Sequence, residues 1–181
     1  DGGGSATTGS PNCNSTSQPL FKFEDPVSED FKVFPDMNEV LNGNNNGVAW
    51  QKLPCTARSL NFKLVVRDNN PNFGRVEEDG VVVTVANTGP FAVTSPNGGQ
   101  MWDGNSMQAV SWNVNGTNSH CADVDILVST DGGVSFSLIA AGVTNDGTQN
   151  ITVPNTGTSS ARVLVQCSVG GDFKSASTFF D

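Results

Sequence analysis

Apolar and polar residues alternate in two parts of the chain, and each time a turn-forming segment divides the alternation. In the segment 123–141, every second position is apolar before and after Asp131-Gly132-Gly133. A period of two that stops at a glycine-rich break and then resumes predicts a β-hairpin. A second pair of such runs lies at 57–67 and 81–86, and the polar cluster 68–74 joins them. The sequence therefore predicts two hairpins, one in each half.

Shorter alternating runs complete the second half. With its hairpin they predict seven strands in about 90 residues, a density typical of immunoglobulin-like or fibronectin-like sandwiches. The additional runs are 91–94, 107–114, 149–153, 161–168 and 175–180.

The first half is less regular than the second. It begins with a Gly/Ser/Thr/Asn-rich arm, followed by a short apolar stretch at 20–23 and one helical turn at 36–41. We predict an all-β protein of two tandem immunoglobulin/fibronectin-like β-sandwich modules. The first, at 1–88, is partial or irregular and carries a flexible N-terminal arm, and the second, at 89–181, is a seven-stranded sandwich.

Composition narrows the classes of partner. The net charge is −9, which argues against nucleic acid, because a phosphate backbone requires clustered Lys and Arg. No apolar run approaches the roughly 20 residues that span a bilayer. The first residue is Asp1, so we expect a start that was processed or cut from a longer chain. The acidity either serves solubility alone or supplies oxygen ligands for calcium.

Four cysteines are present and no two have the C-x-x-C spacing of zinc sites. An even number in a Gly- and Asn-rich acidic chain favours disulfides and an oxidising compartment, with reduced buried thiols as the alternative. Of the three possible pairings we expect Cys13–Cys55 and Cys121–Cys167, since each stays within one half of the chain. A secreted, extracellular or cell-surface location follows.

An acidic cluster at the first hairpin suggests a cation site. Asp68 and Asn70 lie in its turn, and Glu78 and Asp79 precede its second apolar run. Oxygen ligands from two approaching strand ends could hold calcium at roughly 2.3–2.6 Å. The alternative is a solvated acidic turn, because the spacing is not that of an EF-hand loop.

His120 is the only histidine in the chain, so imidazole-based zinc sites and catalytic triads would all depend on it. It stands beside Cys121, and neighbouring residues on a strand point to opposite faces, which disfavours a Cys-His pair. We therefore predict no catalytic residues and no zinc in these 181 residues. A hydrolase that uses His120 is the weakest alternative.

Two further features suggest contacts with ligands. Ser129–Phe136 fits the Asp-box pattern, in which the carboxylate accepts backbone N–H groups of its own turn. This turn stabilises itself, so its structural role outweighs a carbohydrate-contacting one. Trp50 and Trp102 could form a sugar-stacking platform or belong to the core, whereas Trp112 alternates with apolar neighbours and is predicted to be core.

Several segments in this order resemble the region C-terminal to the catalytic domain in large secreted bacterial reprolysin-like zinc metalloproteases. The resemblance covers residues 20–181, although the four cysteines depart from the general pattern. The matching segments are Leu60–Asn69, Val81–Val85, Gly89–Asn97, Val110–Thr117, Val124–Gly133, Thr144–Gly147 and Ile151–Pro154.

The resemblance implies an accessory region, because the zinc-binding helix of that family lies upstream of the matching part. It implies a non-catalytic spacer, stabilising or substrate-docking role, with the upstream catalytic domain of the same precursor as partner. It also suggests that Asp1 lies inside the first module, whose earlier strands are removed or supplied by a preceding segment. An independent cell-surface adhesion or carbohydrate-binding module is the alternative. Extracellular protein or polysaccharide is the expected external partner.

Overall fold

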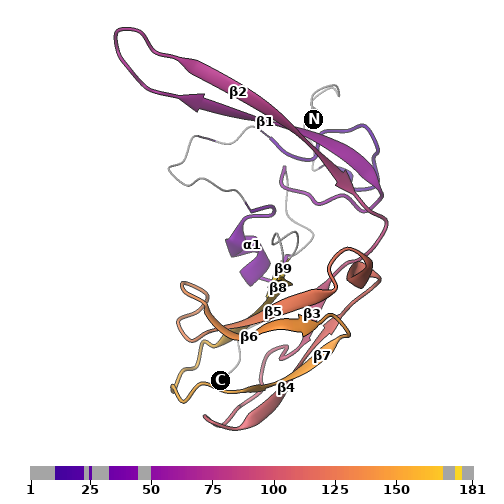
Figure 1. Cartoon of the computed structure of the whole chain (residues 1–181), viewed down its shortest axis with the longest axis vertical. Coiled ribbons are helices and arrows are strands. Elements are labelled where there is room, and N and C mark those ends of the chain that lie inside the picture. Colours follow the sequence, from indigo (N-terminus) through magenta and orange to yellow (C-terminus); the bar gives the residue numbers. More distant parts are fainter. Residues whose placement is uncertain (1–10, 23–24, 26–32, 45–49, 169–173, 177–181) are drawn as a thin grey trace. The chain divides into compact units, whose positions relative to one another are not determined.

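The computed structural model of the chain is almost entirely β-structure, as predicted (Figure 1). It describes residues 11–22, 25, 33–44, 50–168 and 174–176. The chain divides into two compact units. The first unit comprises Asp1–Pro35 and Asn46–Asn87, and the second comprises Asp36–Asn45 and Thr88–Asp181. Parts of the predicted arm and of the strands at 20–23 and 175–180 lie outside the described residues.

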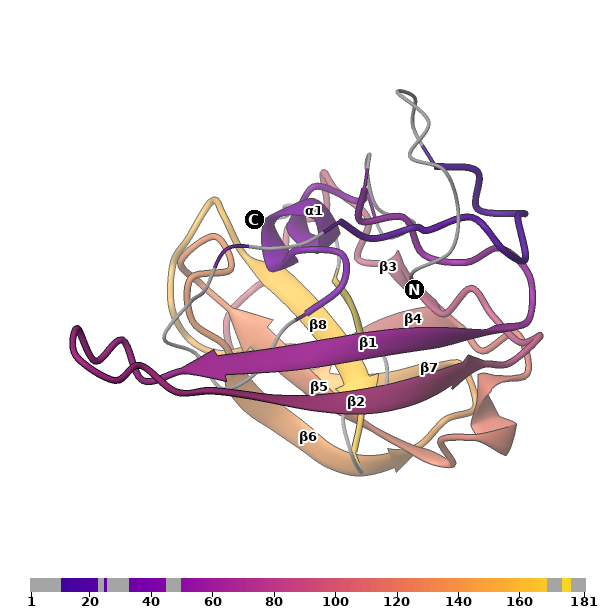
Figure 2. The same ribbon diagram turned by 90° about the horizontal axis from the view of Figure 1, so that it is seen from above.

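The first unit is organised by one long antiparallel hairpin. Strand β1 (Arg58–Arg67) pairs with β2 (Val76–Val85) from Arg58↔Val85 to Arg67↔Val76 (Figure 2). The second strand begins earlier than predicted, because its pairing with β1 continues through the acidic residues 77–79 to Val76. The hairpin itself is confirmed.

Aromatic packing covers one end of this hairpin. The rings of Phe21, Phe34 and Phe62 form a cluster with centroid separations of 4.8–5.5 Å. Leu20 and Leu60 are buried in the same unit. Aromatic side chains bury large areas, so this cluster is a main source of apolar burial among the described residues of the unit.

Residues 11–18 are held close to the start of β1. The predicted Cys13–Cys55 disulfide is present. The buried Arg58 guanidinium donates to the carbonyls of Ser15 and Gln18, both at 2.9 Å. The described part of the predicted flexible arm, residues 11–18, is therefore held by a covalent bond and by hydrogen bonds to the strand.

The remainder of the hairpin is open to solvent. Leu64 is 66% exposed and Val82 is 64% exposed, and they lie on opposite faces of the two strands. Val66, Val76 and Val81 are each more than half exposed as well. Beyond Phe62, Leu64 and Val66 continue the alternation of β1 but are exposed to solvent. Alternation specifies a face, and it does not supply the layer that covers it.

The second unit contains seven strands among its described residues, in two antiparallel sheets ordered β3-β4-β7 and β6-β5-β8-β9 (Figure 1). The 3₁₀ turn η1 (Thr117–Ser119) precedes β5. The strands are β3 (Ala92–Ser95), β4 (Met107–Asn113), β5 (Asp123–Ser129), β6 (Ser137–Thr144), β7 (Thr148–Thr152), β8 (Arg162–Cys167) and β9 (Lys174–Ala176).

Side chains from both sheets form one core in this unit. Val110 and Trp112 from β4 and Ile151 from β7 pack in the same buried cluster as Ile126 from β5 and Val165 from β8. The prediction that Trp112 is a core residue is confirmed. The two sheets thus bury their facing sides, which is the arrangement of a β-sandwich.

A short helix covers the outer side of the second sheet. Helix α1 (Met37–Leu41) forms at the predicted helical turn and belongs to the second unit. Its Val40 packs against Leu164, and the carbonyl of Leu41 accepts a hydrogen bond from the buried Arg162 guanidinium. Because helix and core cover opposite faces, β8 is buried almost continuously.

Candidate functional site

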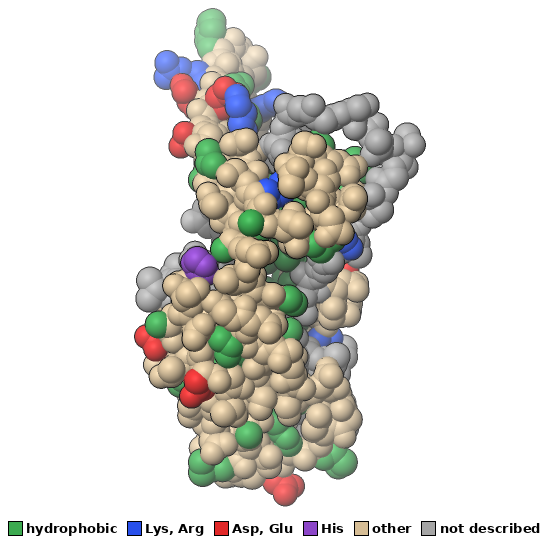
Figure 3. Space-filling view, turned by 90° about the vertical axis from the view of Figure 1, so that its right-hand side faces the viewer, with side chains coloured by type: hydrophobic (Ala, Val, Ile, Leu, Met, Phe, Trp, Pro, Cys, Tyr) green, Lys and Arg blue, Asp and Glu red, His purple; other side chains and the backbone are tan. Residues whose placement is uncertain are grey.

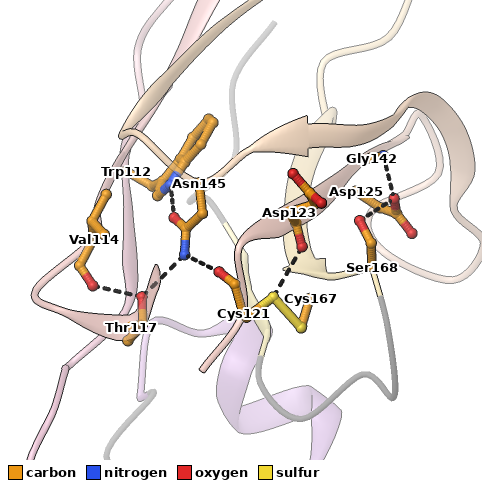
Figure 4. The surroundings of a disulfide bond; sticks show 10 residues. All are labelled: Trp112, Val114, Thr117, Cys121, Asp123, Asp125, Gly142, Asn145, Cys167 and Ser168. Carbon is orange, nitrogen blue, oxygen red and sulfur yellow. Dashed lines mark hydrogen bonds between the residues drawn. A yellow bond between two sulfur atoms is a disulfide. The ribbon is translucent and has the colours of Figure 1, made fainter. Parts of the chain in front are cut away.

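One end of the β-sandwich in the second unit is cross-linked. The predicted Cys121–Cys167 disulfide joins the entry of β5 to the end of β8. Beside it lies the buried Asn145, whose Oδ1 accepts the indole N–H of Trp112 at 2.8 Å (Figure 4). The Asn145 amide donates to the Cys121 carbonyl at 3.0 Å and to the Thr117 hydroxyl at 3.3 Å. These bonds satisfy the buried amide and fix this end of the unit.

The turn of the β5–β6 hairpin is held by its own side chains. Asp131 accepts the Ser129 hydroxyl at 2.6 Å, and the Ser135 hydroxyl and backbone N–H at 2.6 and 3.0 Å. The Ser129 hydroxyl oxygen also accepts the Gly133 N–H at 2.8 Å. The hydrogen bonds from Ser129 and Ser135 lower the pKa of Asp131. The carboxylate is thus used to hold the turn, as its structural role requires.

At the end of the sandwich opposite the disulfide, a hollow of about 200 Å³ opens between loops. Its walls come from the chain before β4, the end of β5 and the connection between β7 and β8. These segments meet because the strands are antiparallel. The start of β4 pairs with the end of β7, and the start of β8 pairs with the end of β5. Trp102, one of the two predicted ligand-binding residues, lines the hollow and packs partly against the core.

The lining is amphipathic and carries no ionisable side chain among the described residues. The buried part of the lining is apolar and consists of Val128, Ile151 and Ala161. Asn155 and Thr156 contribute exposed amide and hydroxyl groups. An aromatic wall, an apolar floor and a few polar groups are the usual features of a small-molecule site.

Backbone and side-chain hydrogen bonds hold the loops around the hollow. Asn105 N–H donates to the Val153 carbonyl at 2.9 Å, and Val153 N–H donates to the Ser106 carbonyl at 3.0 Å. On the other side, the Thr158 hydroxyl donates to the Thr130 carbonyl at 2.8 Å. The shape of the hollow is therefore set before any ligand arrives.

Gly104 permits a close approach between two of these loops. A Cβ at this position would lie 2.5 Å from Oδ1 and 3.0 Å from Cα of Asn155. No real side chain fits at that distance, so only glycine lets the Asn155 amide lie against this turn. Within the described residues, the side chains of Asn155 and Thr156 make no hydrogen bond, which leaves both available to a ligand.

The second predicted ligand-binding tryptophan belongs to the other unit. Trp50 is half-buried, and its carbonyl accepts the Lys22 N–H at 3.2 Å. It shares no described pocket with Trp102.

The residues predicted to bind calcium differ in the hydrogen bonds and ion pairs that they make within the chain. Oδ1 of Asp68 accepts the N–H groups of Asn70 and Arg75, both at 3.0 Å, and these bonds lower the pKa of Asp68. Glu78 pairs with Lys63 at 2.7 Å, and its neighbour Asp79 lies on the opposite face of β2. Among the described residues, no group of three or more His, Cys, Asp or Glu side chains is arranged to hold a metal.

His120 is exposed directly after η1, and it is the purple side chain in Figure 3. The same view shows charged side chains of both signs gathered near the turn of the β1–β2 hairpin. In the described part of the chain, no helix combines the length and the apolar character that crossing a membrane requires.

Comparisons with known proteins add no relative: no protein-family model matches the sequence, and neither the curated proteins nor the solved structures contain a match. The hollow must therefore be interpreted from its chemistry. Sequence reasoning found Trp102 but missed Gly104, Asn155 and Thr156. The available signal was two turn clusters, Asp103-Gly104-Asn105 and Pro154–Gly157, at strand ends that a sandwich places together.

Proposed function

We propose that this chain is a non-catalytic accessory region of a secreted bacterial zinc metalloprotease, and that it docks the enzyme on extracellular protein or polysaccharide. The observation that carries the proposal is the hollow beside Trp102. It offers stacking and hydrogen-bonding groups on a preformed scaffold, and its lining is uncharged within the described residues. Such a site suits binding rather than acid–base or nucleophilic chemistry. The resemblance over residues 20–181 supports the link to a protease.

The finer architecture is part of the proposal. We infer that both units are immunoglobulin-like modules and that the first is incomplete. Leu64, Val66 and Val81 share one face of β1 and β2 and are exposed, which supports this inference, because a sandwich needs a second layer over the apolar face of a sheet. Strands from a preceding segment of the precursor would supply that layer.

A secreted location fits two findings. Both disulfides need an oxidising compartment to persist, and each closes a loop within one unit. The described helices do not span a membrane. Secretion would bring the region and its catalytic domain to extracellular substrates.

An independent adhesion or carbohydrate-binding module is the second candidate, and the same hollow favours it, because the hollow requires no catalytic partner. The precursor sequence separates the two candidates. A zinc-binding helix upstream supports the accessory region, and its absence supports the independent module.

Deletion of this region from the protease tests the docking role directly. We expect the shortened enzyme to hydrolyse a small soluble peptide at the same rate but to be released from insoluble extracellular material. Sedimentation with that material measures the difference. Retention that does not change on deletion would contradict docking.

Calcium binding at Asp68, Asn70, Glu78 and Asp79 remains a prediction. A cation bound only to the folded state raises the melting temperature. A melt in calcium should then exceed a melt in chelator by several degrees. Identical melts would remove the site.

A further inference from the structure

We propose that the hollow beside Trp102 binds one N-acetylated hexosamine unit of a neutral polysaccharide. The inference rests on the proposed docking function and specifies its ligand. Three properties of the site lead to it: the absence of charge in the described lining, the combination of indole and polar groups, and the small size of the hollow.

The charge balance favours a neutral ligand. The described lining contains no cation to hold a sulfate or carboxylate. The whole chain carries a net charge of −9, which repels polyanions. Acidic polysaccharides therefore fit less well than uncharged ones.

The polar groups match a sugar. Hydroxyl and amide groups both donate and accept hydrogen bonds, as the groups of a sugar do. Asn155 and Thr156 provide one of each and use neither within the described chain. The indole of Trp102 offers a flat apolar surface on which the C–H face of a sugar ring can stack.

The floor distinguishes an N-acetylated sugar from a simple hexose. Val128, Ile151 and Ala161 line the hollow with apolar side chains and are the buried members of its lining, so we take them as its floor. A hydroxyl placed there would lose its hydrogen bonds to water, whereas an acetamido methyl gains from burial. The acetamido N–H and carbonyl would meet the Asn155 amide at the rim.

The size limits the contact to one unit. The hollow measures about 200 Å³, below the roughly 300–1,000 Å³ of clefts that enclose drug-sized ligands. A single ring has few atoms, so we expect a dissociation constant on the order of 1 mM for the monosaccharide. Several copies on one polymer would raise retention by avidity.

NMR titration of the full 181-residue chain tests the proposal. The probes are N-acetylglucosamine, its β-1,4-linked trimer, and glucose as the matched sugar without the acetamido group. We expect both N-acetylated sugars to shift the Trp102 indole N–H and Asn155 amide signals, with at least tenfold weaker binding of glucose. No shift at 50 mM, about fifty times the expected dissociation constant, or equal binding of glucose, overturns the proposal.

Three variants locate the binding. Trp102→Ala should weaken binding at least tenfold, as truncation of a central tryptophan commonly does. Asn155→Ala removes an exposed amide without opening the core, so it remains informative if Trp102→Ala misfolds. Met101→Ala is the control, because Met101 is exposed and lies outside the lining. Binding that survives both Trp102→Ala and Asn155→Ala overturns the assignment.

The outcomes also separate this inference from the proposed function. Retention of the protease on insoluble material, with no response to N-acetylated sugars, would refute the ligand and leave docking intact. A sugar response in a chain whose precursor lacks a zinc-binding helix would refute the protease link and leave the ligand intact.

Discussion

The hairpins β1–β2 and β5–β6 have the same sequence pattern but different surroundings. Strand β5 has partners on both sides, β6 and β8, and its Val124 and Ile126 are fully buried. Among the described residues, β1 pairs with β2 alone, and Leu64 and Val82 are mostly exposed. A period of two therefore predicts a strand and its faces, while burial depends on a third strand and a second layer.

The comparison also explains why, among the described residues, one unit has a larger buried core than the other. In the second unit, one cluster of buried side chains lies between the two sheets, and a second lies between helix α1 and the sheet β6-β5-β8-β9. In the first, three phenylalanines and two leucines cover only one end of the hairpin. An isolated two-stranded hairpin is marginally stable, so the first unit depends more on its disulfide and its hydrogen bonds.

The largest expected effect comes from placing the same charge in each hairpin. Val124→Asp puts a carboxylate into a fully buried position and should cost several kcal/mol, enough to unfold the second unit. Val82→Asp lies at an exposed position and should cost less than about 1 kcal/mol. Urea unfolding followed by hydrogen exchange measures each unit separately. Equal losses would show that Val82 is buried in solution.

Removal of each disulfide compares how far the stability of each unit depends on its bridge. The bridges span 42 and 46 residues, so loop entropy predicts the same stabilisation, about 4 kcal/mol for each. We expect replacement of both Cys13 and Cys55 to unfold the first unit. The second unit should stay folded when both Cys121 and Cys167 are replaced. Limited proteolysis of both variants provides the readout, and a stable first unit without its bridge would contradict the argument.

The third prediction concerns helix α1, which lies in the first half of the sequence but belongs to the second unit. Val40 lies in the first half of the chain but packs on Leu164 of the second unit. Val40→Ala should lower the free energy of unfolding of the second unit by about 1–2 kcal/mol and leave the first unchanged. Hydrogen exchange in β8 measures it, and Asn38→Ala, an exposed change in the same helix, is the control. Faster exchange in β1 instead would refute the assignment of α1.

Much of this architecture could be predicted from local pattern. Both hairpins, the buried Trp112 and both disulfides follow from alternation and from keeping each bridge within one half. The position of α1 could not be predicted, because five residues carry too little periodicity to name the sheet they cover. Arg162 gave a similarly weak signal, since a charged residue in a strand is usually exposed.

The candidate site shows the same limit. Trp102 attracted attention as an aromatic residue after a glycine-rich turn, but the other walls of the hollow come from segments much further along the chain, at Val128 and Thr130 and at Ile151–Ala161. That the two loops form one site can be recognised only when the order of the strands in the sheets is known. Gly104 is understood from the structure alone, since its requirement comes from Asn155 rather than from its own turn.

The smallest expected effect compares the turns of the two hairpins. Asp131 and Asp68 both have a lowered pKa, Asp131 chiefly through hydroxyl donors and Asp68 chiefly through the backbone N–H of Asn70. A depressed folded-state pKa contributes stability above the unfolded value of about 3.9, and this stability is lost as the pH falls towards the folded value. Asp131→Asn and Asp68→Asn should therefore melt slightly below the parent at pH 7, and the difference should shrink below about pH 4. Melting curves from pH 7 to 2.5 measure it, and a difference that stays constant over this range would show that neither carboxylate is held in its charged form by its turn.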